Sequence, residues 1–108
     1  WQVYVINHTL LCFEHCSSPS NIINMTGPET ASVRHIARQF AQLFEKEVTF
    51  INAESPTALL NNASKAAKLF GYPSVPLLRM IEWVAQWIEL GGPSLDKPTH
   101  FEVRDGKY

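Results

Sequence analysis

Two histidines and two cysteines lie close together near the beginning of this 108-residue chain. They fall at positions i, i+4, i+7 and i+8, and on a helix they would share one face: His8, Cys12, His15 and Cys16. Imidazole nitrogen and thiolate sulfur are ligands that zinc accepts. A single helix rarely supplies a closed tetrahedral site, however, and these cysteines can equally pack as small apolar side chains. We therefore predict no metal site, and a small metal-binding protein remains an alternative.

A second group of side chains could meet a phosphate. Arg34, His35 and Arg38 lie close together on a predicted helix. Clustered charges on a helix usually form a solvated face, and we favour that interpretation here. The carboxylates Glu82 and Glu89 show no pairing suited to acid–base chemistry.

The stretch from Asn24 to Ile51 must position Arg34, His35 and Arg38. A short apolar run, residues 22–25, ends at Gly27-Pro28, and a helical period follows from Ser32, the natural N-cap. The strand-like residues 48–51 come after that helix. Two strands around a crossover helix predict a parallel or mixed sheet.

The rest of the chain supplies further helices. Val3 to Ile6 is strand-like, and we expect a helix from about Asn7 to Cys16. Two more helices are predicted, one capped by Asn61 or Asn62 and ending at Gly71, and one from Pro76 to Gly91. His100 to Val103 is again strand-like.

This pattern predicts the α/β class: a single small α+β domain over residues 1–108, with three to four helices and short strands. The predicted core is apolar and comes from the helices and the second strand: Ile36, Phe40, Leu43, Phe44, Phe50, Phe70, Ile81, Val84 and Ile88.

Composition narrows the function classes. A net charge of −1 and a pI near 6.5 argue against a nucleic-acid partner. No apolar run reaches membrane-spanning length and no signal peptide is evident, so we expect a cytoplasmic protein without a membrane partner. Two cysteines do not form a disulfide framework.

Three segments in order resemble one family. They are Asn24-Met25-Thr26-Gly27-Pro28-Glu29 with Ser32-Val33-Arg34, then residues 58–66 with Leu69-Phe70-Gly71-Tyr72, then Val75-Pro76-Leu77. Together they resemble the C-terminal, substrate-side part of extended short-chain dehydrogenase/reductases, the NAD-dependent nucleotide-sugar epimerase/dehydratase group. The resemblance implies a subdomain that closes over a sugar nucleotide, with Thr26, Gly27, Glu29 and Arg34 as substrate-binding residues.

The chain lacks the parts of that family that hold NAD and perform catalysis. Its five glycines cannot form the Gly-rich phosphate loop of a Rossmann domain. The catalytic tyrosine and lysine lie four residues apart in the family, whereas His8 follows Tyr4 and Pro76 follows Tyr72 at that spacing. We therefore predict no catalytic or cofactor-binding residues and no cofactor bound by this chain alone; NAD enters by resemblance only.

Two functions follow besides the metal-binding alternative. The chain is either the substrate-binding portion of an epimerase/dehydratase-like protein, inactive alone, or a stand-alone binding or assembly module that has lost this chemistry. In both cases we expect apolar surface that a missing Rossmann domain or a second copy in a homodimer covers. The alternative is that the N-terminal segment folds back over Trp83 and Trp87 within one chain. The predicted interface residues are Val3, Val5, Trp83 and Trp87.

Overall fold

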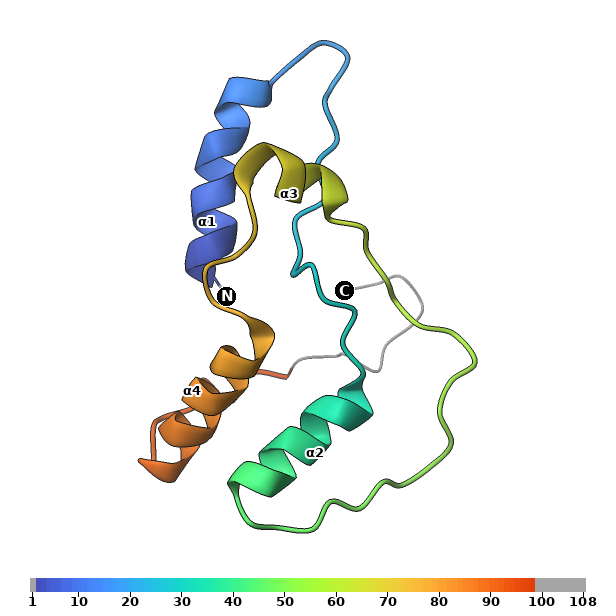
Figure 1. Ribbon diagram of the computed structural model, residues 1–108, viewed down its shortest axis with the longest axis vertical. Helices are drawn as coiled ribbons and strands as arrows, with labels where there is room; N and C mark the ends of the chain where they lie inside the picture. Colours follow the sequence, from blue (N-terminus) through green and yellow to red (C-terminus); the bar gives the residue numbers. More distant parts are fainter. Residues whose placement is uncertain (1, 99–108) are drawn as a thin grey trace.

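The computed structural model describes residues 2–98 and contains four α-helices in that range: α1 (Gln2–Leu11), α2 (Val33–Leu43), α3 (Ser64–Phe70) and α4 (Leu77–Glu89). A 3₁₀ turn, η1 (Cys12–His15), extends α1. Helix α1 packs on α3, and α2 packs on α4 (Figure 1). Within residues 2–98 no other two α-helices pack together, so the fold consists of two helix pairs that loops connect.

Residues 2–98 contain no β-strand, so the predicted α/β class is wrong and the described fold is all-α. A strand needs a second strand to pair its backbone groups, and the segments 22–25 and 48–51 do not pair. The first segment is held by side-chain contacts instead, because Lys65 Nζ donates to the carbonyl of Ile22 at 2.8 Å. In the second segment the ring of Phe50 lies under the guanidinium of Arg34. The predicted strand His100 to Val103 lies outside the described residues.

The N-terminal segment is helical from Gln2, so the prediction of a strand-like start at Val3 to Ile6 is also wrong. A helix satisfies its backbone groups within its own segment and needs no neighbouring strand. It also places Tyr4 and His8 on one side, four residues apart, where both rings contact each other.

The other three predicted helix starts are confirmed by their caps. Ser32 Oγ accepts a hydrogen bond from the backbone N–H of His35 at 3.4 Å, which caps α2. Asn62 Oδ1 accepts from the N–H of Ser64 at 2.9 Å at the start of α3. Pro76 directly precedes α4, where its missing N–H costs nothing.

The predicted core is mostly wrong, because few apolar side chains are buried. Of the nine predicted core residues only Ile81 is buried, and Leu43, Phe50, Val84 and Ile88 are exposed. The buried hydrophobic residues in the described range are small apart from Ile81: Ala63, Ala66, Ile81 and Ala85. Each helix pair therefore covers only one stripe of each helix and leaves the remaining apolar faces open.

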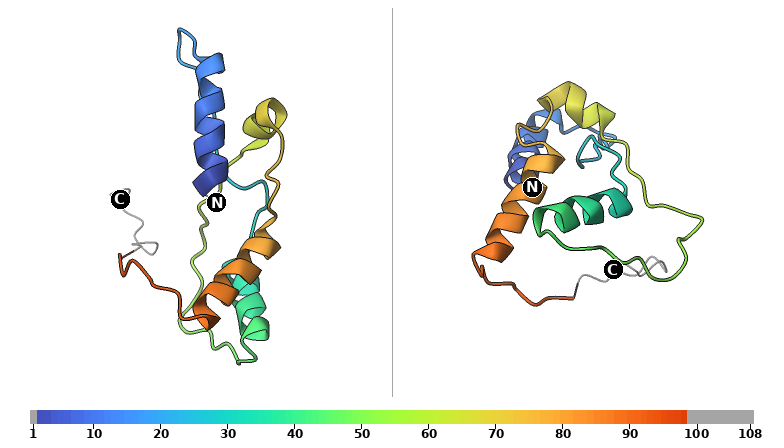
Figure 2. Two further views of the ribbon diagram at one scale, coloured as in Figure 1. Left: turned by 90° about the vertical axis from the view of Figure 1, so that its left-hand side faces the viewer. Right: turned by 60° about the horizontal axis from the view of Figure 1, so that its bottom comes forward.

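The shape of the molecule agrees with this sparse packing. Its principal extents are 51 × 33 × 25 Å and its radius of gyration is 16.9 Å, against about 13 Å for a compact domain of 100 residues. Figure 2 shows α1 and α3 at one end and α2 and α4 at the other. The chain is elongated because its two pairs sit end to end.

Helices α2 and α4 end in the same hydrogen-bonding motif. In α4, Gly92 N–H donates to the carbonyl of Trp87 at 2.9 Å, and Gly91 takes the left-handed conformation with φ +68°. In α2, Lys46 N–H donates to the carbonyl of Ala41 at 2.9 Å, and the left-handed position is held by Glu45 with φ +52°. Both are Schellman motifs, and glycine suits this position because it has no Cβ to clash.

The two motifs predict stability changes of opposite sign. Glu45→Gly should stabilise the fold by roughly 0.5–1 kcal/mol, because it removes the strain of a left-handed non-glycine residue. Gly91→Ala should destabilise it by about 1 kcal/mol through the same strain, since no atom blocks a Cβ there. Thermal unfolding by circular dichroism measures both changes. If both substitutions shifted the unfolding temperature in the same direction, the assignment of residues 45 and 91 to equivalent left-handed positions would be contradicted.

Candidate functional site

An apolar groove lies where the first turn of α1 meets α4. It has a volume of about 540 Å³ and is lined by Gln2, Val3, Met80, Trp83, Val84 and Trp87. The groove therefore brings together three of the four predicted interface residues, which come from the two ends of the sequence. The fourth, Val5, is exposed on α1 but does not line the groove.

The chain that follows α4 fixes the position of Trp87 in this groove. The indole Nε1 of Trp87 donates to the carbonyl oxygen of Pro93 at 3.2 Å. Gly92 lies so close to the indole that a Cβ there would come within 2.1 Å of Trp87 Cε2. Only glycine allows this approach, so the Gly91-Gly92-Pro93 stretch both ends α4 and holds one wall of the groove.

The four predicted substrate-binding residues do not form one site. Thr26 is half-buried, and Gly27 and Glu29 are exposed on the loop before α2, whereas Arg34 lies in the first turn of α2. Glu29 and Arg34 line different cavities, of about 530 and 200 Å³. Their carboxylate and guanidinium groups therefore do not converge on a shared ligand position.

Glu29 and Arg34 instead make contacts within the chain. Glu29 Oε1 accepts a hydrogen bond from the N–H of Leu77 at 3.4 Å, which places a carboxylate at the N-terminus of α4, where the helix dipole favours negative charge. Arg34 Nη2 lies 2.6 Å from Glu54 Oε1, and its guanidinium carbon lies 4.1 Å from the centre of the Phe50 ring. Arg34 thus holds the loop after α2 against that helix.

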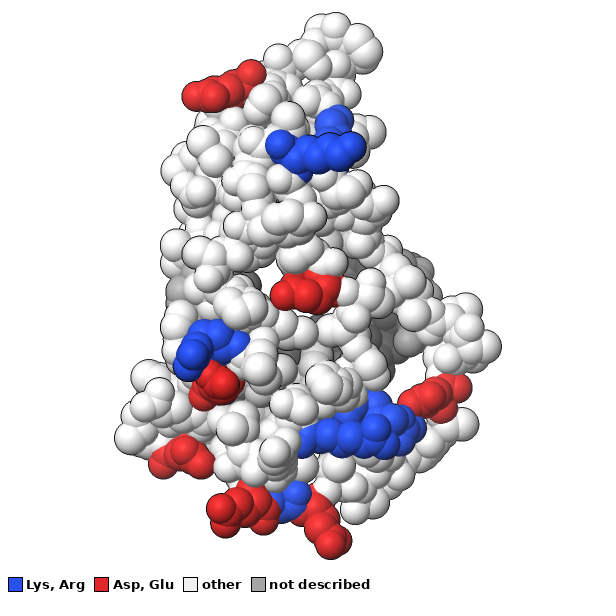
Figure 3. Space-filling view, viewed as in Figure 1, with Lys and Arg blue, Asp and Glu red and all other residues white. Residues whose placement is uncertain are grey.

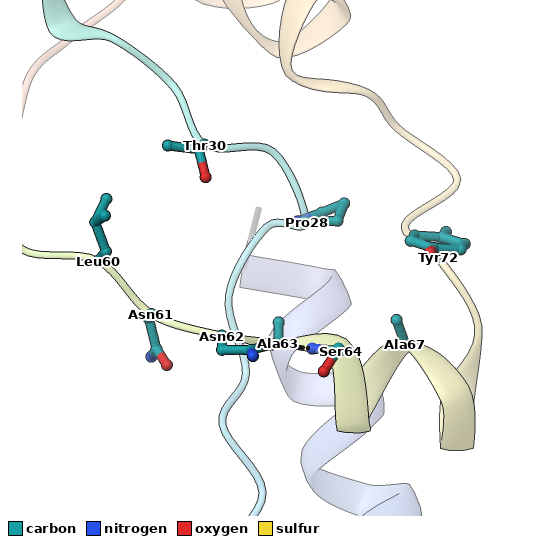
Figure 4. Close-up of a pocket in the computed structure, with 9 residues that line it drawn as sticks. All are labelled: Pro28, Thr30, Leu60, Asn61, Asn62, Ala63, Ser64, Ala67 and Tyr72. Carbon is teal, nitrogen blue, oxygen red and sulfur yellow. Dashed lines mark hydrogen bonds between the residues drawn. The ribbon is translucent and has the colours of Figure 1, made fainter.

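A cavity that no sequence pattern predicted lies beside the predicted substrate loop. Its volume is about 470 Å³, and its lining is uncharged: Pro28, Thr30, Leu60, Asn61, Asn62, Ala63, Ser64, Ala67 and Tyr72. Figure 4 shows the side chains of Pro28 and Tyr72 on one side and Leu60 on the other. Three loop segments and α3 form this cavity, so no single sequence motif could reveal it.

The fold does not arrange the candidate metal ligands as a metal site within residues 2–98. His8 is 3% exposed, with its ring 3.9 Å from that of Tyr4 and 5.0 Å from that of Phe70. Cys12, His15 and Cys16 line a cavity of about 250 Å³ that His8 does not line, and both thiols are free. In the described range, residues 2–98, no three His, Cys, Asp or Glu side chains are placed to hold a metal ion.

The burial of His8 changes its acid–base behaviour. Nδ1 of His8 is buried and has no hydrogen-bond partner among residues 2–98. Burial lowers the pKa of His8, because the apolar rings around it disfavour the charged imidazolium. The same burial raises the pKa of Tyr4. His8 is therefore neutral in the folded chain at pH 7 and fills the gap between α1 and α3.

Comparison with known proteins adds no assignment. No family model matches the chain, and no curated protein or solved structure gives a significant match. Within the described residues no helix is both long and apolar enough to cross a membrane.

Histidine 8 makes the stability of the fold depend on pH. Its pKa is lower in the folded than in the unfolded chain, where it is about 6.5. The unfolded chain therefore takes up a proton first, and stability is lost as the pH falls through about 6.5. We expect a lower midpoint of urea unfolding at pH 5.5 than at pH 7.5.

Two variants check that His8 causes this dependence. His8→Phe keeps an aromatic ring between Tyr4 and Phe70, removes the unpaired nitrogen and should stabilise the fold at pH 7 by about 1 kcal/mol. It should also flatten the pH dependence. The control His35→Gln changes an exposed histidine and should leave the dependence intact. If His8→Phe retains the full dependence, another group is responsible.

Proposed function

We propose that this chain is the substrate-binding portion of an NAD-dependent epimerase/dehydratase-like protein and is not catalytic on its own. The nucleotide-binding domain that holds NAD would be a separate body. The order of the segments at Asn24–Glu29, Ala58–Ala66 and Leu69–Tyr72 supports the resemblance. The sequence has no Gly-rich loop and no tyrosine–lysine pair, which supports the assignment of NAD binding and catalysis to a separate domain.

One observation carries this proposal: the described residues do not complete a core. Four hydrophobic side chains are buried, whereas 23 large hydrophobic side chains are exposed. Soluble monomers rarely leave so much apolar surface open, and extended apolar patches usually mark an interface. A segment that folds against a larger domain explains both the elongated shape and the unpaired segment 48–51.

The substrate would meet the loop before α2. Pro28 and Thr30 of this loop line the uncharged cavity beside α3, together with Asn61, Ser64 and Tyr72. Hydroxyl and amide groups next to an aromatic ring suit a neutral, polar group such as a sugar ring. Arg34 lies one turn further along, but its charge is already paired with Glu54.

The second candidate function is a homodimeric assembly module that has lost the reductase chemistry. The groove of Val3, Met80, Trp83, Val84 and Trp87 favours it, because aromatic side chains in an apolar groove commonly anchor protein interfaces. The two candidates differ in what covers the apolar surface.

Calorimetry with NAD and NADH tests the first proposal. The isolated chain should show no binding, because none of the glycines within residues 2–98 forms a phosphate-binding loop at the start of a helix. Expressed together with a nucleotide-binding domain of the epimerase/dehydratase type, it should become more stable when NAD is added. Micromolar NAD binding by the isolated chain would contradict the proposal, and so would a failure of that domain to associate with it.

A further inference from the structure

Helix α1 presents an apolar stripe that the described structure leaves mostly exposed. Its residues are Val3, Ile6, Leu10 and, in η1, Phe13, and they are between 60% (Ile6) and 73% (Phe13) exposed. The spacing of three, four and three residues places them on one side of the helix. Tyr4 and His8, which pack towards α3, lie on roughly the opposite side.

This stripe is also free of charge. Helix α1 contains no lysine, arginine, aspartate or glutamate, and the first charged residue is Glu14 in η1. In Figure 3 the surface over α1 is uncoloured except near its upper end. A helix that is apolar on two opposite sides is normally covered on both.

We infer that a second copy of this chain covers the stripe, through antiparallel pairing of the two α1 helices about a two-fold axis. The spacing of three, four and three is the same in both directions along the helix. Antiparallel helices therefore match in one register, which sets Val3 opposite Phe13 and Ile6 opposite Leu10. A two-fold contact needs such a self-complementary surface.

Charge supports a second copy as the occupant. An uncharged stripe can meet itself without repulsion between like charges. In the same register Glu14 falls opposite Gln2 of the second copy, so neither carboxylate faces its own symmetry mate. A charged partner surface would find no complementary charge on this side of α1.

The groove beside α4 completes the contact. Val3 lies at the end of the stripe and also lines the groove with Met80, Val84 and Trp87. In this register Phe13 of the second copy lies opposite Val3, so the Phe13 ring enters the groove of the first copy. By the two-fold symmetry, Phe13 of the first copy enters the groove of the second. A stable interface buries about 1,200–2,000 Å² of accessible surface in total. A pair of helices about 15 Å long buries less than this. The two Phe13 rings in the two grooves therefore add to the buried area.

This inference specifies the contact of the homodimer that is the second candidate function above. Sedimentation or light scattering at about 100 µM tests it first, because standard-size interfaces have dissociation constants of micromolar or below. We expect twice the mass of one copy, 12.2 kDa. A monomer at that concentration overturns the inference and leaves the stripe to the nucleotide-binding domain of the first proposal, which the calorimetry tests separately.

Charge substitutions locate the contact. Phe13→Lys and Ile6→Lys should each weaken dimerisation at least tenfold, because they bury an ammonium group in an apolar interface. Leu59→Lys adds the same charge at an exposed leucine outside the stripe and should leave the dimer intact. Unchanged helicity by circular dichroism shows that the fold is preserved. A dimer unaffected by both stripe variants overturns the inference.

Cross-linking tests the register without disrupting the fold. In a chain with Cys12→Ser and Cys16→Ser, the substitutions Ile6→Cys and Leu10→Cys are made separately. Antiparallel pairing predicts that oxidation links the mixture of the two variants efficiently and each variant alone poorly. Efficient linkage of each variant alone would show parallel pairing, and no linkage in the mixture would exclude contact along α1. Either result overturns the proposed arrangement.

Discussion

The two helix pairs of this chain meet without a helix–helix interface, and the rest of the structure depends on that constraint. Helix α1 is held to α3 by the rings of Tyr4, His8 and Phe70, and α2 is held to α4 around Ile81 and Ala85. Between the pairs, the first turn of α1 and helix α4 border an apolar groove, and loops make the remaining connections within residues 2–98. The open apolar faces, the groove at the junction and the elongated shape all follow.

The sequence predicted the features that depend on local interactions. The caps at Ser32 and Asn62 and the glycine at the end of α4 were evident, because a cap needs only side chains within a few residues. The strands at 22–25 and 48–51 were predicted from side-chain preference, but a strand forms only with a second strand. Burial was overestimated for the same reason, since periodicity identifies an apolar face and not what covers it.

The candidate sites also include features that the sequence predicted and features that only the tertiary structure shows. Trp83 and Trp87 were predicted as interface residues, and the fold places them with Val3 in one groove. Glu29 and Arg34 were assigned to a ligand by resemblance, whereas their observed partners are Leu77 and Glu54, distant in sequence. The uncharged cavity near Tyr72 is built from segments around positions 30, 62 and 72, and only the tertiary structure could show it.

The order of the helices along the chain has a consequence for proteolysis. The connection between α2 and α3 spans about 20 residues that are almost entirely exposed and have no regular structure, which makes it a natural site for protease cleavage. Because α1 pairs with α3 and α2 pairs with α4, one cut there divides both pairs between the two fragments. Neither fragment contains a complete pair. A nicked chain must therefore remain associated as a two-fragment complex or lose both halves of the fold together.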